Sequence, residues 1–184
     1  NKLLHEFATP NRAAAPTFSP DLKTLAFADC VGNLGVESVI YTLELETGKQ
    51  TKIGSCYGPI IRLAFSGDGK RLVGASVYGL MALAAKLQLQ RDIHGEVAVF
   101  DVSSQKDLLR MAYVLPENVS PTSVEKWFRH VPTHIALDQD GSTLLLASTS
   151  GLIKVIDVET GDNRISMELD GEPAKPQETP ETGA

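Results

Sequence analysis

Short apolar runs, separated by residues that favour turns, recur along most of this chain. Near the C-terminal end they read HIALD, TLLLAST, LIKVIDV and NRISMEL, with Asp140-Gly141 and Glu159-Thr160-Gly161 among the turns. Asp-Gly readily supplies the positive-φ residues of a tight hairpin turn, so these runs predict short antiparallel strands. Several runs are apolar at almost every position, as expected where both faces of a sheet are covered. The pattern predicts small sheets stacked on one another rather than one sandwich.

The same pattern occurs three times along the chain. The repeats begin with FSPDLKTLAFA at Phe18, FSGDGKRLVGA at Phe65 and LDQDGSTLLLA at Leu137, which align without gaps. A second shared stretch carries an acidic residue in each repeat, at intervals of 57 and 56 residues: Glu44, Asp101 and Asp157. Such a period is that of a blade-like repeat lengthened by insertions.

These repeats resemble the blades of WD-repeat β-propellers, over a stretch from Lys2 to Leu169. The best match is STSGLIKVID, from Ser148 to Asp157, where the family has a turn, a small residue and an alternating strand that ends in Trp-Asp. No Gly-His dipeptide precedes a first strand here. The dipeptides at the place of Trp-Asp are Leu43-Glu44, Phe100-Asp101 and Ile156-Asp157. The resemblance implies an all-β fold, a β-propeller segment of four-stranded antiparallel blades.

The repeats divide the chain into a propeller segment, residues 1–169, and a tail, residues 170–184. We expect the outer strand of a truncated blade followed by three complete blades, at residues 1–9, 14–55, 60–114 and 133–169. Propellers usually need about 4–8 blades to close a ring, so we expect a partial propeller cut from a longer chain. A second copy that completes the ring, or an open stack with covered ends, is the alternative.

The tail, DGEPAKPQETPETGA, has four acidic residues, one Lys and no large apolar residue, which predicts disorder. It carries a net charge of −3, half of the chain's −6. The sequence has neither the Lys/Arg excess of a phosphate-binding surface nor an apolar run of about 18 residues, so we expect no nucleic-acid or membrane partner. The N-terminal NKLLHEF has no apolar signal core, which favours the cytoplasm.

Two long insertions are the best indication of a binding surface. Residues 77–92 join strands two and three of the second repeat, and residues 115–132 join the second repeat to the third. Antiparallel strand order places both on one rim, and long loops in a compact domain are often functional. The residues expected to face a protein partner there are Met81, Leu83, Arg91, Trp127, Phe128, Arg129 and His130.

The second insertion contains a capping box, Thr122-Ser123-Val124-Glu125, which predicts a short helix over Ser123–His130. Trp and Arg are over-represented among interface hot spots, so Trp127 and Arg129 suit a partner-facing surface. Alternatively, Trp127 packs onto the blade edge and only anchors the loop. The first insertion is rich in Leu, Ala, Met and Gln, which permits one or two helical turns or a protruding hairpin.

The sequence lacks the usual catalytic and metal-binding patterns. Its four histidines occur singly, and Cys30 and Cys56 are too few for a four-ligand zinc site. The segment Ser66–Gly69 has the composition of a phosphate loop but the place of a hairpin turn. Asp101 and Asp157 occupy equivalent repeat positions, so we interpret them as structural. We expect no enzyme activity, metal or cofactor.

These observations favour a non-enzymatic protein-interaction scaffold whose partner docks on the insertion-bearing rim. One alternative is a propeller enzyme or sensor, lactonase-like or quinoprotein-like, with a ligand site at the central channel. The inner positions of the first strands make a poor ligand set: Pro16, Thr17, Ile61, Arg62, Thr133 and His134. Another alternative is a passive spacer beside a signalling or catalytic domain, with the Pro/Glu tail as a linker.

Overall fold

The computed structural model describes residues 6, 11–30, 37–77, 93–114, 131–148 and 151–168, without the side chains of residues 93, 94, 113, 114 and 168. The expected helix over 123–130 and the expected tail over 170–184 lie outside these residues. Of the expected outer strand over 1–9, only Glu6 is described, and it is exposed and belongs to no strand.

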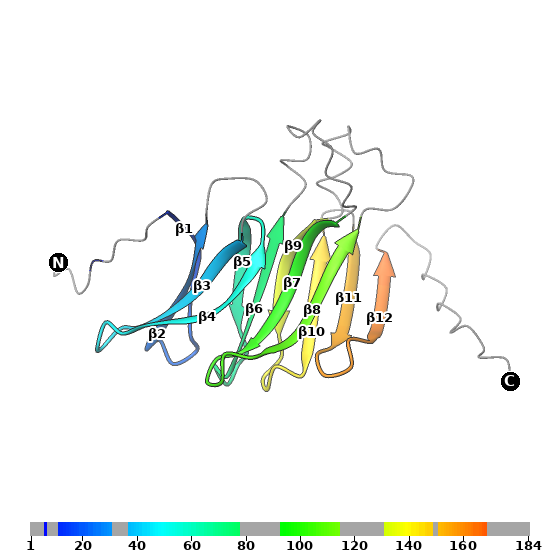
Figure 1. Cartoon of the computed structure of the whole chain (residues 1–184). Coiled ribbons are helices and arrows are strands. Elements are labelled where there is room, and N and C mark those ends of the chain that lie inside the picture. The colour runs from blue at the N-terminus through cyan, green and yellow to red at the C-terminus, as the bar shows by residue number, and fades with distance from the viewer. Residues whose placement is uncertain are drawn as a thin grey trace, which may run out of the picture.

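Within the described residues, every regular element is a strand, and the strands form three four-stranded antiparallel sheets (Figure 1). The first sheet contains β1 (Arg12–Phe18), β2 (Thr24–Cys30), β3 (Glu37–Glu44) and β4 (Gln50–Tyr57). The second contains β5 (Ile60–Phe65), β6 (Arg71–Val77), β7 (Ile93–Asp101) and β8 (Asp107–Val114). The third contains β9 (Pro132–Leu137), β10 (Thr143–Ser148), β11 (Leu152–Asp157) and β12 (Asn163–Glu168).

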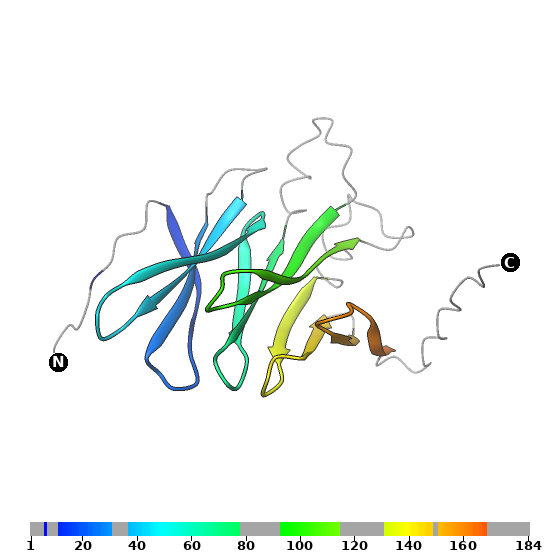
Figure 2. The same cartoon turned by 60° about the horizontal axis from the view of Figure 1, so that its bottom comes forward.

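Each sheet is a simple meander, because strands that are neighbours in the sequence are neighbours in the sheet. The sheets lie side by side in chain order (Figure 2), and β5 contacts both β1 and β9. The predicted fold class, all-β with four-stranded antiparallel sheets, is confirmed, and the arrangement is compatible with propeller-like blades. The sheets span residues 12–57, 60–114 and 132–168, within two residues of the predicted blades.

Serine and aspartate side chains build the first turn of each sheet. In the second sheet, Ser66 Oγ donates to Asp68 Oδ1 (2.7 Å), and the backbone N–H groups of Lys70 and Arg71 donate to Asp68 Oδ1 and Ser66 Oγ (both 3.0 Å). The corresponding turn pairs in the first and third sheets are Ser19 with Asp21 and Asp138 with Asp140. Ser66–Gly69 is therefore the hairpin turn that its repeat position predicts.

Each sheet has a backward face, turned toward the preceding repeat, and a forward face, turned toward the next. The forward face of the first sheet packs on the backward face of the second through Ala26, Ala28, Cys30, Ile40, Ile53, Cys56, Ile60, Leu63, Leu72, Ala98 and Phe100. The forward face of the second sheet packs on the backward face of the third through Val73, Ala75, Val97, Val99, Leu144, Ile156 and Val158. The core is therefore two separate layers, one in each joint between sheets.

Phe100, the largest fully buried side chain, fills the joint between the first and second sheets. It faces Gly54 on β4, where an added Cβ would lie 2.3 Å from Phe100 Cε1. The ring thus occupies the space that a side chain at Gly54 would need. Burial of a phenyl ring stabilises a fold by about 1.5–3 kcal/mol. This contact fixes how closely the two sheets approach.

Candidate functional site

Both insertions leave and enter the sheets at one edge. The strands β6 and β8 end at this edge with Val77 and Val114, and β7 and β9 begin there with Ile93 and Pro132 (Figure 1). Val77 and Pro132 belong to strands, so the structure places each of these insertion limits one residue further into the loop. The arrangement agrees with the expected shared rim.

The rim residues singled out in the sequence lie outside the described residues. This holds for Met81, Leu83, Arg91, Trp127, Phe128, Arg129 and His130. Their role as a partner-facing surface stays a prediction. The structure adds information about their support, because Val131 and Pro132, the last two residues of the predicted second insertion, are buried.

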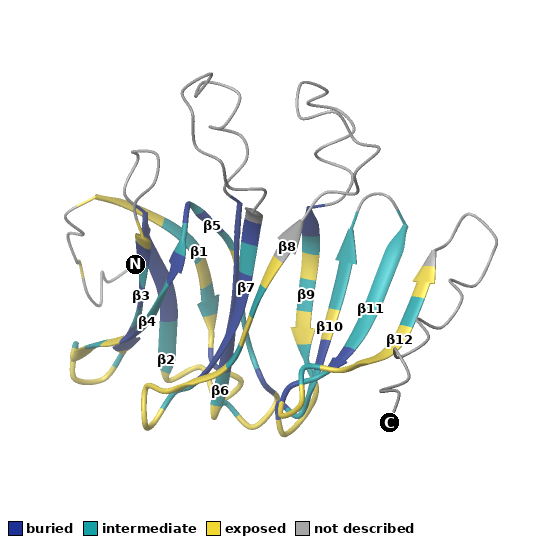
Figure 3. Cartoon of the chain, turned by 45° about the vertical axis from the view of Figure 1, so that its right-hand side comes forward, coloured by how far each residue is buried: buried dark blue, intermediate teal, exposed yellow. Residues whose placement is uncertain are grey.

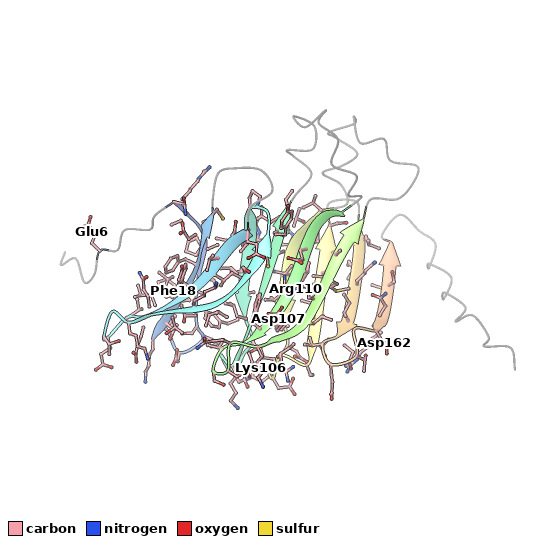
Figure 4. All side chains as sticks on the ribbon, viewed as in Figure 1. Glu6, Phe18, Lys106, Asp107, Arg110 and Asp162 are labelled. Atoms are coloured by element: carbon pink, nitrogen blue, oxygen red, sulfur yellow. The ribbon has the colours of Figure 1, made fainter. Side chains whose placement is uncertain are left out.

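A polar cluster along β7 and β8 ties the first sheet to the second. Arg110 Nη1 lies 2.8 Å from Glu96 Oε2, and Arg110 Nη2 lies 2.7 Å from Asp107 Oδ2. The same guanidinium donates to the carbonyl oxygen of Ser55 on β4 (3.0 Å) and lies over the Phe100 ring, 5.9 Å from its centroid. Figure 4 labels Asp107 and Arg110 on β8. One surface arginine thus contacts two carboxylates and the neighbouring sheet.

Glu96 also binds the segment that connects the two sheets. Its Oε2 accepts a hydrogen bond from the backbone N–H of Tyr57 (2.9 Å), and Ser76 Oγ donates to the Tyr57 carbonyl oxygen (2.7 Å). Because both bonds reach the end of β4, they hold the chain where it passes from the first sheet to the second. This cluster was not expected from the sequence, since Glu96 and Arg110 lie on different strands without any motif spacing.

The two cysteines lie at the rim ends of β2 and β4, on the side predicted for them, and both are buried free thiols. Burial, with a smaller contribution from the negative charge of Glu96, raises the pKa of Cys56 to about 12. Cys30 Sγ lies 3.8 Å from the carbonyl oxygen of Ile60. A buried, protonated thiol is a poor nucleophile and metal ligand, so Cys56 acts as a small core residue.

Contacts on the inner strands involve four of the six predicted channel residues. Arg62 Nε donates to the carbonyl oxygen of Thr133 (3.0 Å), and Arg62 Nη1 donates to that of Ile61 (2.9 Å). Thr133 Oγ1 lies 3.1 Å from His134 Nδ1. The guanidinium thus joins β5 to β9. Pro16 and Thr17, on β1, do not take part in these contacts.

The repeat-equivalent aspartates hold turns. The backbone N–H of Ser104 and the hydroxyls of Ser103 and Ser104 donate to Asp101, and these bonds lower the pKa of that carboxyl to about 2. Hydrogen bonds from Arg164 and the backbone of Thr160 lower the pKa of Asp157. Each carboxylate is bound by its own turn, so the structural interpretation of both residues is confirmed.

Among the described residues, no group of three or more His, Cys, Asp and Glu side chains is placed to hold a metal ion. The described part of the chain also contains no helix long and apolar enough to cross a membrane.

One apolar surface was not expected from the sequence: the forward face of the third sheet. Leu145, Ile165 and Met167 are 39%, 49% and 44% exposed on it. Figure 3 shows the contrast between the buried β6 and β7 of the second sheet and the more exposed strands of the third. The apolar pattern of several strands predicted sheets covered on both faces, but within the described residues no further sheet packs on this face of the third sheet.

No family model matches this chain, and no curated protein matches it. The fold is described by three four-stranded antiparallel sheets in a propeller-like arrangement. Its function must be argued from its own surfaces.

Proposed function

We propose that this chain is a non-enzymatic, WD-repeat-like propeller segment that serves as a protein-interaction scaffold, with its partner bound on the insertion-bearing rim. The observation that carries the proposal is that the first insertion starts and ends at one edge of the second sheet, and the second insertion runs from this edge to the same edge of the third sheet. Loops on a rigid support are the usual place for binding residues. A protein partner would contact both insertions at once.

The second sheet is the best supported of the three. Both of its faces are packed, one in each core layer. The Glu96–Arg110 cluster ties it to the first sheet, and Arg62 ties it to the third. A site held on such a support loses little conformational entropy when a partner binds.

The proposal is tested by altering the rim without altering the sheets. In one variant, residues 78–92 are replaced by Asn-Gly, which leaves Asn, Gly, Ile93 and His94 as a short hairpin connection. A second variant carries Trp127→Ala and Arg129→Ala. A control variant carries Lys49→Ala and Lys106→Ala, at exposed turns of the opposite rim.

The measurement is quantitative affinity capture with each purified variant, followed by titration of the recovered partner. We expect both rim variants to lose at least about tenfold in affinity, about 1.4 kcal/mol, while the control binds normally. Circular dichroism checks that each variant is folded. Unchanged partners for both rim variants would remove the rim hypothesis and favour the passive spacer.

A further inference from the structure

The forward face of the third sheet repeats, residue by residue, a surface that is buried elsewhere in the same molecule. In the second sheet, Val73, Val99 and Leu109 form one cross-strand row, because Val73 pairs with Val99 and Val99 with Leu109. In the third sheet the same register joins Leu145, Val155 and Ile165. The next row consists of Ala75, Val97 and Met111 in the second sheet, and of Ala147, Ile153 and Met167 in the third.

The two copies of this surface differ in what covers them. In the second sheet, Val73, Val97 and Val99 are at most 1% exposed, because the backward face of the third sheet packs on them. In the third sheet, Leu145 at the position of Val73 is 39% exposed, and Ile153 and Val155 at the positions of Val97 and Val99 are only partly buried. The rows end in Ile165 and Met167, which are nearly half exposed, whereas Leu109 and Met111 in the second sheet are partly buried against the third. The molecule thus shows what this pattern of side chains binds: the backward face of a sheet built on the same repeat.

We propose that the forward face of the third sheet binds the backward face of the first sheet of a second copy of this chain, in a head-to-tail joint. This surface is separate from the insertion-bearing rim. In the second and third sheets the backward face packs through Phe65 and Leu137, at the end of the innermost strand. Phe18 has that position in the first sheet and is 55% exposed (Figure 4).

The first turns also match across such a joint. Between the second and third sheets, the backbone N–H groups of Gly67 and Asp68 donate to the carbonyl oxygens of Asp138 and Gln139 (3.1 and 2.8 Å). In the first turn of the third sheet, Gln139 and Asp140 occupy the repeat positions of Gly67 and Asp68, so their backbone N–H groups would be the donors in the proposed joint. The acceptors in a second copy would be the carbonyl oxygens of Ser19 and Pro20. Pro20 lacks an N–H but retains its acceptor, so it suits this side of the joint.

Side-chain size is complementary at the same place. Arg71 of the second sheet lies over Gly141, where an added Cβ would be 2.5 Å from Arg71 Cδ. The repeat position of Gly141 is occupied in the first sheet by Leu22, which is 68% exposed with φ +59°. The residue facing Leu22 in the joint would be Thr143, at the repeat position of Arg71. In the proposed joint, the short side chain of Thr143 would therefore meet the longer one of Leu22. Between the second and third sheets, the long side chain of Arg71 meets Gly141 in the same way.

Two such joints would close two chains into a ring with twofold symmetry. Each chain contributes three described sheets, and the resulting six sheets lie within the range of about 4–8 blades at which propeller rings close. A head-to-tail contact whose rotation does not close would instead give open filaments. The proposed joint therefore predicts a discrete dimer.

The test compares Ile165→Glu on the forward face and Phe18→Glu on the backward face with Leu108→Glu. Leu108 is an exposed apolar residue on β8 and serves as the matched control. Sedimentation and light scattering across a concentration series measure association. We expect the unaltered chain and the Leu108→Glu variant to dimerise, and each of the other two variants to associate at least about tenfold more weakly. A mixture of the two weakened variants should form a 1:1 dimer, because one intact joint remains possible between them.

Several outcomes would overturn the proposal. They are a monomeric unaltered chain, association that survives both substitutions, and association that depends on Ile165 but not on Phe18, which would indicate that two forward faces meet. Should either glutamate variant unfold, cysteine pairing provides the decision. Copies with Leu22→Cys mixed with copies with Thr143→Cys should form an intermolecular disulfide, and Leu108→Cys with Thr143→Cys should not. Equal cross-linking in the two mixtures would also reject the joint.

Discussion

At the scale of single residues, the turns of this protein depend on carboxylates and on left-handed backbone positions. The last hairpin of each sheet has such a position, with Gly48 (φ +73°), Gln105 (φ +61°) and Gly161 (φ +78°) in the three repeats. The backbone N–H of each of these residues donates to the carbonyl oxygen of the acidic residue four positions earlier (2.8–2.9 Å). The turn geometry is thus conserved among the repeats even where glycine is not.

Substitution Asp101→Asn tests the carboxylate of the second sheet. The pKa of Asp101 in the folded protein is about 2, below the value of about 3.9 in an unfolded chain. The ionised group therefore stabilises the fold fully above about pH 4, and this contribution is lost as the pH falls through about 2. We expect the variant to be about 1 kcal/mol less stable at pH 7. Denaturant unfolding of both proteins should show this difference shrinking below pH 4; a difference independent of pH would contradict the argument.

Substitution Gln105→Gly tests the left-handed position. A side chain in this conformation lowers the free energy of unfolding by about 1–2 kcal/mol. Glycine lowers it by about 0.5–1 kcal/mol, because glycine makes the unfolded chain more flexible. The variant should therefore be more stable by roughly 0.5–1 kcal/mol in urea unfolding. Gly161→Ala, at the same position of the third sheet, is the matched control and should be destabilised. A less stable Gln105→Gly protein would show that the side chain makes a contact worth more than the backbone strain.

At the scale of elements, the first joint is set by one close approach between sheets. In the first joint, the ring of Phe100 on β7 occupies the space above Gly54 on β4. The corresponding residue in the second joint is Ile156, also fully buried. In the first joint a large residue thus meets a glycine, and the spacing of the first two sheets follows from this pair.

Substitution Gly54→Ala should destabilise the first joint by about 1–3 kcal/mol, because the new methyl group would overlap the Phe100 ring. Thermal unfolding of the single variant and of the double variant Gly54→Ala with Phe100→Leu measures this effect. The smaller leucine makes room for the methyl group, so the double variant should lose less stability than the sum of the two single changes. Strictly additive losses would show that the two positions do not compete for space.

At the scale of the whole molecule, the chain is a stack in which each sheet depends on its neighbours. Among the described residues, the second sheet is covered on both faces, whereas the third is packed on its backward face only. Stacked repeats gain stability from each interface with a neighbour. The middle of the stack should therefore be its most stable part.

Amide hydrogen exchange tests this gradient. We expect the slowest exchange in β6 and β7, with faster exchange in β10 and β11, which hold the same places in the third sheet. Measurement at dilutions that keep the chain monomeric provides the comparison. If the head-to-tail joint forms at higher concentration, protection of β10 and β11 should rise with it. Equal protection of the two sheets at every dilution would contradict the stacking argument.

Most of the fold was accessible from the sequence, because strands and turns are local. Alternation identified the strands to within one or two residues in many cases, and Asp-Gly at Asp68 and Asp140 identified two turns correctly. The cluster of Glu96 and Arg110 was not accessible, since its contacts join residues whose proximity depends on strand register and on the neighbouring sheet. The rim residues such as Trp127 lie outside the described residues and stay a prediction.

Local sequence patterns specify the repeated unit: four short strands, their turns, and two apolar faces for each sheet. Which of these faces is covered depends on how the sheets pack on one another. Val99 and Val155 are the same residue at the same repeat position, yet Val99 is fully buried and Val155 only partly. Whether a residue is buried depends on the surface that packs against it, and a repeat in the sequence specifies only one of the two surfaces. The difference between these two valines is what makes the third sheet a candidate binding face.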